Sequence, residues 1–278
     1  MATPDSSRSR SLSIRLVVVL VSLVSSAWGS GEPWSSSAVD AAGPDKTVAG
    51  SERPDQPGEP YEVFLYDPRV IPAVGIFEVH SSGEGGGPSG VTFRDVETSV
   101  GSRGRKVLFA TNGGIFESPS EPTGLLVSGG RILAPLNTRS GQGNFYAKPN
   151  GVFFLEGKEA RVLSTDQFRG RQGVPNLAIQ SGPLLLENGK VLRRQSEVRI
   201  GRRSGVGIRE DGAALFLFTE SQVSLHDFAL AFKDRGCGDA LYLDGAISEF
   251  FVAGPGKEVP NTRSFATVLA LTAPPDER

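Results

Sequence analysis

The chain has 278 residues, and its 29 Lys and Arg residues nearly balance its 31 Asp and Glu residues, giving a net charge of −2 at pH 7. Without a basic excess, nucleic-acid binding is disfavoured. A single Cys excludes an intramolecular disulfide, and with only two His residues a classical zinc site is disfavoured. We therefore expect no metal or other cofactor, although a calcium ion held by scattered Asp and Asn oxygens stays open.

Residues 1–27 have the pattern of a secretory signal peptide. Three Arg residues precede the apolar run 16–24, and small residues follow it up to Ala27 or Gly29, where cleavage would fit. The run is short for a membrane span, and an uncleaved anchor is the alternative. We expect a periplasmic or secreted protein with no stable membrane span after cleavage.

Residues 28–60 are predicted to form a disordered linker. Gly, Pro and Ser fill 15 of these 33 positions. Such a segment buries too little apolar surface to offset the entropy lost on ordering. The folded domain is therefore expected to span residues 61–273.

Short apolar runs separated by turn residues predict a succession of strands in this domain. The first four are expected at residues 61–66, 74–79, 91–96 and 106–111. Four hairpins follow, at 125–127 with 131–133, 152–155 with 160–163, 184–186 with 191–192, and 206–209 with 213–218. In the last two hairpins, Asn188-Gly189 and Asp211-Gly212 are expected to supply the positive φ angles of type I′ turns.

One helix is predicted near the C-terminal end of the domain. Ser224 and Asp227 have the spacing of an N-cap pair, and Gly236 is a typical helix stop. An apolar strand, 240–243, comes next and ends in Asp244. The pattern indicates a single-domain α+β fold, with mixed or antiparallel β-sheets rich in hairpins and few helices.

Two turns and loops carry residue types suited to a ligand. Asn112 is followed by Gly113 and Gly114, which let backbone N–H groups point at a ligand, although the same residues also make ordinary turns. The segment 143–151 combines Asn144, Lys148 and Asn150 with two aromatic residues, a mixture that suits a sugar. The alternative is a loop anchored by its own aromatic side chains.

Polar residues also interrupt three apolar strands. Gln180 and Ser181 need hydrogen-bonding partners if buried, and a satisfied β-bulge is the plain alternative. Arg202 and Arg203 begin a strand, where an Arg can bind an anion bidentately or simply remain solvated. Asp244 ends an apolar strand, either as a functional carboxylate or as part of an Asp-Gly turn.

Five segments in order resemble the phosphodiester glycosidase family, particularly its bacterial branch. They are Asn112-Gly-Gly-Ile-Phe116, Gly143-Asn-Phe-Tyr-Ala-Lys-Pro-Asn-Gly-Val-Phe153, Ala178-Ile-Gln-Ser-Gly-Pro183, Arg203-Ser-Gly-Val-Gly207 and Ala240-Leu-Tyr-Leu-Asp-Gly-Ala-Ile-Ser248. This family includes the mammalian lysosomal uncovering enzyme, N-acetylglucosamine-1-phosphodiester α-N-acetylglucosaminidase. The resemblance extends from Tyr61 to Thr272. Ala246 stands where the broader family often has a second Gly.

The resemblance implies hydrolysis of a sugar C1–O bond whose leaving group is a phosphate monoester, on a small-molecule or polymeric glycan. Asp244, Arg203 and Asn112 would then be the catalytic residues, with Arg203 and the turn after Asn112 stabilising negative charge. Residues expected to bind substrate are Gly113, Gly114, Asn144, Lys148, Asn150, Gln180, Ser181 and Glu220, while Glu220 and Glu249 are reserve carboxylates. Two alternatives are a non-catalytic sugar-phosphate- or glycan-binding module and a different hydrolase or transferase acting on envelope glycopolymers.

Overall fold

The structure, a computed structural model, describes residues 61–69, 76–81, 90–118, 121–193, 199–245, 247–260 and 263–273. The signal peptide and linker expected within residues 1–60 lie outside this range, as does Ala246, and these expectations stay predictions. Within the described ranges, no helix has both the length and the apolar character needed to cross a bilayer.

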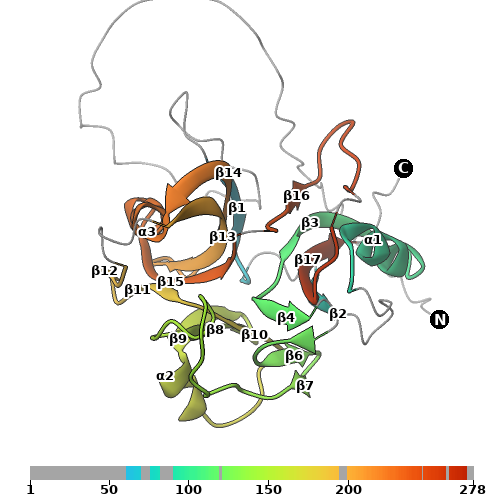
Figure 1. The fold of residues 1–278 in the computed structure, drawn as a ribbon. Helices are drawn as coiled ribbons and strands as arrows, with labels where there is room; N and C mark the ends of the chain where they lie inside the picture. Colours follow the sequence, from blue (N-terminus) through green and yellow to red (C-terminus); the bar gives the residue numbers. More distant parts are fainter. Residues whose placement is uncertain are drawn as a thin grey trace, which may run out of the picture. The chain divides into compact units, whose positions relative to one another are not determined.

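The described part of the chain consists mainly of antiparallel β-sheets (Figure 1). The six-stranded sheet has the order β1 (Glu62–Tyr66), β14 (Ala214–Ser224), β13 (Ile200–Arg209), β15 (Cys237–Asp244), β11 (Leu184–Glu187) and β12 (Lys190–Val191). The five-stranded sheet has the order β7 (Arg131–Ala134), β6 (Leu126–Ser128), β10 (Leu177–Ser181), β8 (Gly151–Glu156) and β9 (Glu159–Ser164).

Two smaller sheets and the helices complete the described elements. The four-stranded sheet has the order β16 (Phe250–Val252), β3 (Lys106–Asn112), β17 (Thr267–Ala273) and β2 (Ile76–Ser81), while β4 (Phe116–Ser118) pairs with β5 (Glu121–Pro122). The helices are α1 (Phe93–Gly101), α2 (Thr165–Arg169) and α3 (Leu225–Asp234). The predicted α+β class, hairpin-rich and poor in helix, is confirmed.

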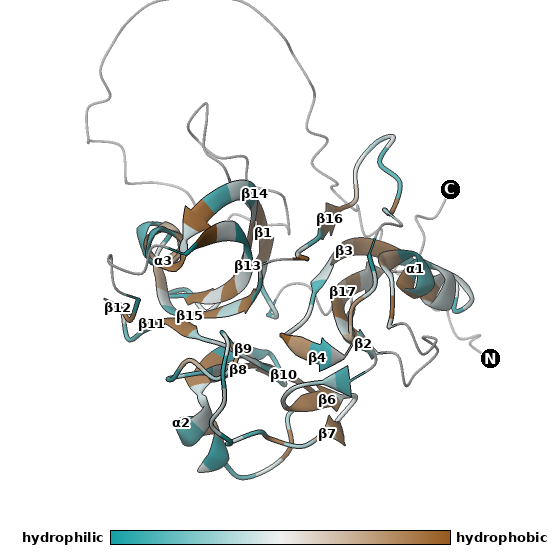
Figure 2. Ribbon diagram, in the orientation of Figure 1, coloured by the Kyte–Doolittle hydropathy of each residue, from teal (hydrophilic) through white to brown (hydrophobic). Residues whose placement is uncertain are grey.

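Aromatic side chains join the three larger sheets in one core. Phe216 of the six-stranded sheet, Phe109 of the four-stranded sheet and Phe153 of the five-stranded sheet are each at most 1% exposed. The Phe216 ring centroid lies 5.1 Å from that of Phe109 and 5.7 Å from that of Phe153. Hydrophobic residues run along β17, whereas α2 is largely hydrophilic (Figure 2). This shared core fixes the strand ends on which the candidate site is built.

The predicted C-terminal helix is confirmed as α3. The Ser224 side chain accepts a hydrogen bond from the Asp227 backbone N–H, and Gly236 has φ +76° just after the helix. Phe228 and Phe232 are fully buried in a second apolar cluster, which also contains Tyr242 of β15. The helix thus covers the strand that carries Asp244.

The strand predicted at residues 91–96 is wrong, because this segment forms the start of α1. Thr92 caps the helix, and its side chain and that of Asp95 form a reciprocal capping box. The buried residues Phe93, Val96 and Val100 follow helical spacing. Of the predicted strand, Val91 makes only an isolated bridge to Phe265.

The two hairpin turns expected to be type I′ differ. Asn188 and Gly189 have φ values of +49° and +73°, which confirms the first. In the second, Gly212 has φ +84°, but Asp211 is not in the left-handed region, so the predicted geometry is wrong there. The Asp211 side chain instead accepts a hydrogen bond from the Ala213 backbone, and a polar side chain that caps its own loop favours a different turn.

Candidate active site

Asp244 lies at the end of β15 and keeps partial exposure after a fully buried run, Ala240–Leu243. Its backbone carbonyl accepts hydrogen bonds from the Ser204 hydroxyl at 3.0 Å and from the Ser248 hydroxyl at 2.8 Å. One of its carboxylate oxygens accepts the Gly245 backbone N–H. A rigid strand therefore presents this carboxylate with its main chain held on two sides.

The Asn112 side chain connects β3 to this strand end and is only 1% exposed. Its Nδ2 donates to the Ser204 hydroxyl at 3.0 Å and to the Gly113 carbonyl at 3.2 Å. Its Oδ1 accepts from the Glu249 backbone N–H at 3.3 Å and the Thr111 hydroxyl at 3.4 Å. The amide thus uses two donors and two acceptor positions inside the chain. Direct contact with a substrate would require it to exchange one of these bonds.

The turn after Asn112 needs glycine because other atoms pass very close. The Gly113 N–H donates to the Thr267 carbonyl at 2.8 Å, and a Cβ atom added at Gly113 would lie 1.9 Å from the Thr267 hydroxyl oxygen. A Cβ atom added at Gly114 would lie 2.5 Å from the Gln180 carbonyl oxygen. Packing accounts for both glycines, and their contact with a ligand stays a prediction.

Arg203 of β13 is a buried cation, 6% exposed, beside the same strand end. Its guanidinium donates to the carbonyl oxygens of Arg199 at 2.7 Å and Arg202 at 3.2 Å and to the Tyr242 hydroxyl at 3.4 Å. Its Nε is buried and has no hydrogen-bond partner in the part of the chain that the structure describes. Among the described residues, its hydrogen-bond partners are all neutral oxygens, so no carboxylate pairs with it directly. Arg202, the preceding residue of β13, is exposed.

Tyr242 links Arg203 to the loop that precedes β8. Burial raises the pKa of Tyr242 to about 12, although the Arg203 charge and a hydrogen bond with Asn144 oppose this shift. The phenol therefore stays protonated at neutral pH and offers a hydrogen bond. A Cβ atom added at Gly245 would lie 2.1 Å from the Tyr242 hydroxyl and 2.9 Å from Nη1 of Arg203. Asn144, Tyr242 and Arg203 thus converge on the turn after Asp244.

Gln180 and Ser181 lie at the end of β10, and their buried side chains make hydrogen bonds to neighbouring segments. The Gln180 side chain accepts from the backbone N–H groups of Leu125 and Asn137 at 3.0 and 2.9 Å. It donates to the Asn137 carbonyl at 2.8 Å and the Thr165 hydroxyl at 3.0 Å. The chain itself therefore satisfies the buried Gln180 amide, and its predicted contact with substrate stays a prediction.

The Ser181 hydroxyl joins β10 to the strand that presents the carboxylate. It donates to the Leu243 carbonyl at 2.8 Å and accepts from the Ile115 backbone at 3.2 Å. Ser181 thus reaches the residue immediately before Asp244.

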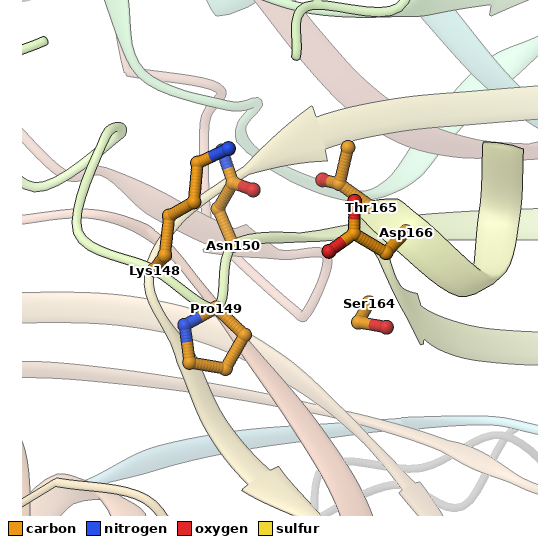
Figure 3. Close-up of a pocket in the computed structure, with 6 residues that line it drawn as sticks. All are labelled: Lys148, Pro149, Asn150, Ser164, Thr165 and Asp166. Atoms are coloured by element: carbon orange, nitrogen blue, oxygen red, sulfur yellow. The ribbon is translucent and has the colours of Figure 1, made fainter. Parts of the chain in front are cut away.

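Lys148 and Asn150 line a separate pocket of about 290 Å³ (Figure 3). Figure 3 shows these two side chains on one side and those of Thr165 and Asp166 on the other. The Lys148 ammonium donates to the Thr138 carbonyl at 3.2 Å, and the buried Asn150 amide donates to the Phe145 carbonyl at 2.9 Å. Mixed charge and amide groups of this kind suit hydroxyl-bearing ligands.

The two reserve carboxylates occupy different places. Glu220 is exposed, and burial together with the Glu220 charge raises the pKa of Glu62, which locates Glu220 beside β1. The Glu249 backbone bonds to Asn112, its carboxylate lies 3.8 Å from Nε of Arg263, and burial raises its pKa. Glu249 is thus the reserve carboxylate that directly adjoins the Asn112 end of β3.

Cys237, the single Cys of the chain, is a free, buried thiol. Burial raises the pKa of Cys237 to about 12, so the thiol is protonated at neutral pH. No cluster of three His, Cys, Asp or Glu side chains suited to a metal is found in the part of the chain that the structure describes.

Sequence reasoning overlooked Ser204, Ser248, Tyr242 and Thr267 as components of the site. Ser204, Tyr242 and Ser248 lie inside the segments that resemble the family, and for Ser204 and Tyr242 the signal was a polar atom in an otherwise apolar strand. Their partners depend on which strands pair, and local sequence does not specify that pairing.

Comparison with known proteins gives three findings. The sequence profile of the phosphodiester glycosidase family matches residues 105–272. The uncharacterized protein YigE of Escherichia coli (strain K12) is 35% identical over 186 residues, 65% of this chain and 71% of YigE. The solved structure of the zebrafish N-acetylglucosamine-1-phosphodiester α-N-acetylglucosaminidase catalytic domain, auto-inhibited by its pro-peptide, has a TM-score of 0.53 and 18% identity. The match covers 80% of this chain and 86% of the zebrafish chain, and it shows that the two share a fold.

Proposed function

Because the chain belongs to the phosphodiester glycosidase family, we propose that it is an exported hydrolase that cleaves the sugar C1–O bond of a sugar-1-phosphodiester. The matched residues 105–272 contain Asn112, Arg203 and Asp244. The family and fold are those of a hydrolase, while the substrate and the export are our proposal.

The observation that carries this proposal is the buried guanidinium of Arg203, whose hydrogen-bond partners within the described ranges are all neutral. A buried charge without a counter-ion is costly, so such a residue is typical of a site that receives an oppositely charged ligand. A phosphodiester carries one negative charge, and the planar fork of Arg matches its oxygens. Tyr242, protonated at neutral pH, supplies a further donor beside the same group.

Asp244 is then the carboxylate placed at the anomeric carbon. It would stabilise positive charge developing on the sugar, remove a proton from water, or act as the nucleophile. The departing phosphate monoester is a stable anion, so it needs less protonation than an alkoxide leaving group. Arg203 beside Gly245 would hold the departing phosphate close to this carboxylate.

The polar lining of the pocket with Lys148 and Asn150 supports a sugar-containing ligand, and we propose a glycan of the envelope or the extracellular medium as the substrate. Asn144 belongs to the same loop and reaches Tyr242, so one loop connects the phosphate side with the sugar side. We propose that this loop binds sugar hydroxyls through its amides and Lys148. Export is proposed from the signal-like residues 1–27.

Hydrolysis in H₂¹⁸O with mass-spectrometric analysis of products tests the proposal. Purified protein is incubated with a series of sugar-1-phosphodiesters, with Asp244→Asn as the matched control. We expect a free sugar and an unlabelled phosphate monoester, because C1–O cleavage sends the solvent oxygen to the sugar. Label in the phosphate would indicate P–O cleavage, and binding without turnover would favour the non-catalytic module. Either result would overturn the proposal.

A further inference from the structure

Ser204 lies at the centre of the polar groups around Asp244 and is completely buried. Its hydroxyl oxygen is 3.0 Å from Asn112 Nδ2, 3.0 Å from the Ser248 hydroxyl and 3.0 Å from the Asp244 carbonyl. The Asp244 backbone N–H also donates to it, at 3.3 Å. One hydroxyl therefore contacts both backbone groups of the predicted catalytic residue.

The strand pairing explains why a hydroxyl is needed at this position. β13 and β15 are antiparallel, with Ser204 opposite Asp244 and Gly205 opposite Tyr242, so the register shifts between these pairs. Such a bulge interrupts the regular ladder and re-aims side chains, and bulges are common next to active sites. The Ser204 hydroxyl bonds the Asp244 N–H and carbonyl at the point where the ladder is irregular.

We propose that Ser204 is a positioning residue that fixes the Asp244 carboxylate for reaction, an inference that rests on the proposed function. The hydroxyl donates its proton to the Asp244 carbonyl and accepts from Asp244 N–H and Asn112 Nδ2, which uses its donor and both lone pairs. Ser248 reinforces the same carbonyl at 2.8 Å. Through Asn112, the arrangement also links Asp244 to β3 of the neighbouring sheet.

Loss of the hydroxyl would release Asp244 without removing any group that touches substrate. Small displacements of a reacting group have large kinetic effects, on the order of 100-fold per ångström. Ser204→Ala should therefore lower kcat by about 10- to 100-fold and leave KM almost unchanged. In an Asp244→Asn background the same change should cause no further loss of kcat, because Ser204 acts through Asp244.

A matched control is available at the other end of the four-stranded sheet. Thr272 of β17 is another completely buried hydroxyl in a side-chain network, bonded to Arg105 and Glu78. Thr272→Val should reduce stability and leave kcat at the wild-type level. Ser248→Ala, which removes only part of the contacts, should lower kcat less than Ser204→Ala, and it serves if Ser204→Ala does not fold.

Amide hydrogen exchange tests positioning without relying on turnover. Ser204→Ala should speed exchange at Asp244 and Gly245, while Thr272→Val should not. Wild-type kcat in folded Ser204→Ala, an equal further loss in the Asp244→Asn background, or unchanged exchange at Asp244 would each overturn the inference. A wild-type protein that hydrolyses no sugar-1-phosphodiester would overturn the proposed function, and the exchange measurement would still decide whether Ser204 holds Asp244.

Discussion

Arg203 and Arg105 are both largely buried, but only Arg105 lies beside a carboxylate within the described residues. Arg105, which precedes β3, donates to the Thr272 hydroxyl and carbonyl at 3.0 and 2.6 Å and lies 3.9 Å from the Glu78 carboxylate. Arg103 also pairs with Glu78, at 2.8 Å. Arg203 has three neutral oxygens and an unpartnered Nε within the described residues.

The difference distinguishes a structural ion network from a site prepared for a ligand. Around Glu78 the protein supplies both signs of charge, so the network is complete without a partner. Beside Asp244 the protein supplies a buried cation and a carboxylate that it holds through the main chain, without pairing the two in a direct ion pair among the described residues. The missing negative charge is what a phosphodiester would provide.

Of the substitutions in the two regions, neutralising Asp244 should lower turnover most. Asp244→Asn keeps the size of the side chain, so we expect near-native thermal stability and a loss of turnover of at least about 100-fold. Glu78→Gln, in the complete ion network, should keep wild-type turnover. Wild-type activity in Asp244→Asn would move the chemistry elsewhere, with Glu249, the reserve carboxylate that adjoins Asn112, the next residue to test. Unfolding of this variant would instead indicate a structural turn residue.

Replacing Arg203 and Arg105 by lysine, one at a time, compares how much activity depends on the arginine in each region. Arg203→Lys keeps the charge but loses the planar fork, so kcat/KM for phosphodiesters should fall by about 10- to 100-fold. Neutral glycosides should be affected far less, and Arg105→Lys should affect neither class. Steady-state kinetics on both substrate classes decides this, and equal losses on both would identify Arg203 as a structural residue.

The Glu78 network should reveal itself through pH-dependent stability. Burial alone would raise the pKa of Glu78, but hydrogen bonds from Thr272 and Arg103 and the nearby His80 outweigh burial and hold the pKa below its usual range. A depressed folded-state pKa stabilises the fold above the unfolded-state pKa, and this contribution disappears as pH falls through the folded-state value.

Glu78→Gln should therefore cost about 1 to 2 kcal/mol at pH 7. The difference from wild type should shrink as the pH falls through the lowered pKa of Glu78. Denaturant unfolding of both proteins between pH 7 and pH 3 measures this. A difference that stays constant over this range would show that the charge of Glu78 is not what matters.

Substitution of Cys237, which lies outside both regions, should have the smallest effect on stability and turnover. Its thiol is buried and its pKa is raised to about 12, so it should resist alkylation in the native protein at pH 8. Cys237→Ala should cost about 1 kcal/mol of stability and leave turnover unchanged. Loss of activity in the folded variant would give this thiol a role in the site.

Local patterns predicted the hairpins and α3 because a turn or a cap is encoded within a few residues. The Asn188-Gly189 turn and the Ser224 cap are examples. The segment 91–96 failed because its apolar spacing fits a strand and a helix alike, and the capping box at Thr92 decides for the helix. β17 was not predicted, and its place between β3 and β2 depends on pairing between distant parts of the chain, which local sequence does not specify.

The candidate site was predictable to the same extent. Asp244 and Arg203 could be selected from sequence because a charged residue in an apolar strand is conspicuous. Ser204 could not, because its importance arises from a register shift between β13 and β15. Gln180 was selected for a buried amide, and the structure shows that the chain satisfies that amide by itself.

Gln180 and its neighbours fix the two ends of the long loop before β8. The residues that keep the fold stable are therefore different from those that could contact a ligand. Residues 135–150 contain no helix or strand, and Gln180 fixes the loop at Asn137 while the Phe145 carbonyl and the Thr165 N–H fix it at Asn150. Between these anchors, residues 139–143 are exposed. Lengthening such a loop is inexpensive, about 0.6 kcal/mol for each doubling. The length of this loop, and with it the positions of Asn144 and Lys148, can therefore change in evolution while the sheets stay unchanged.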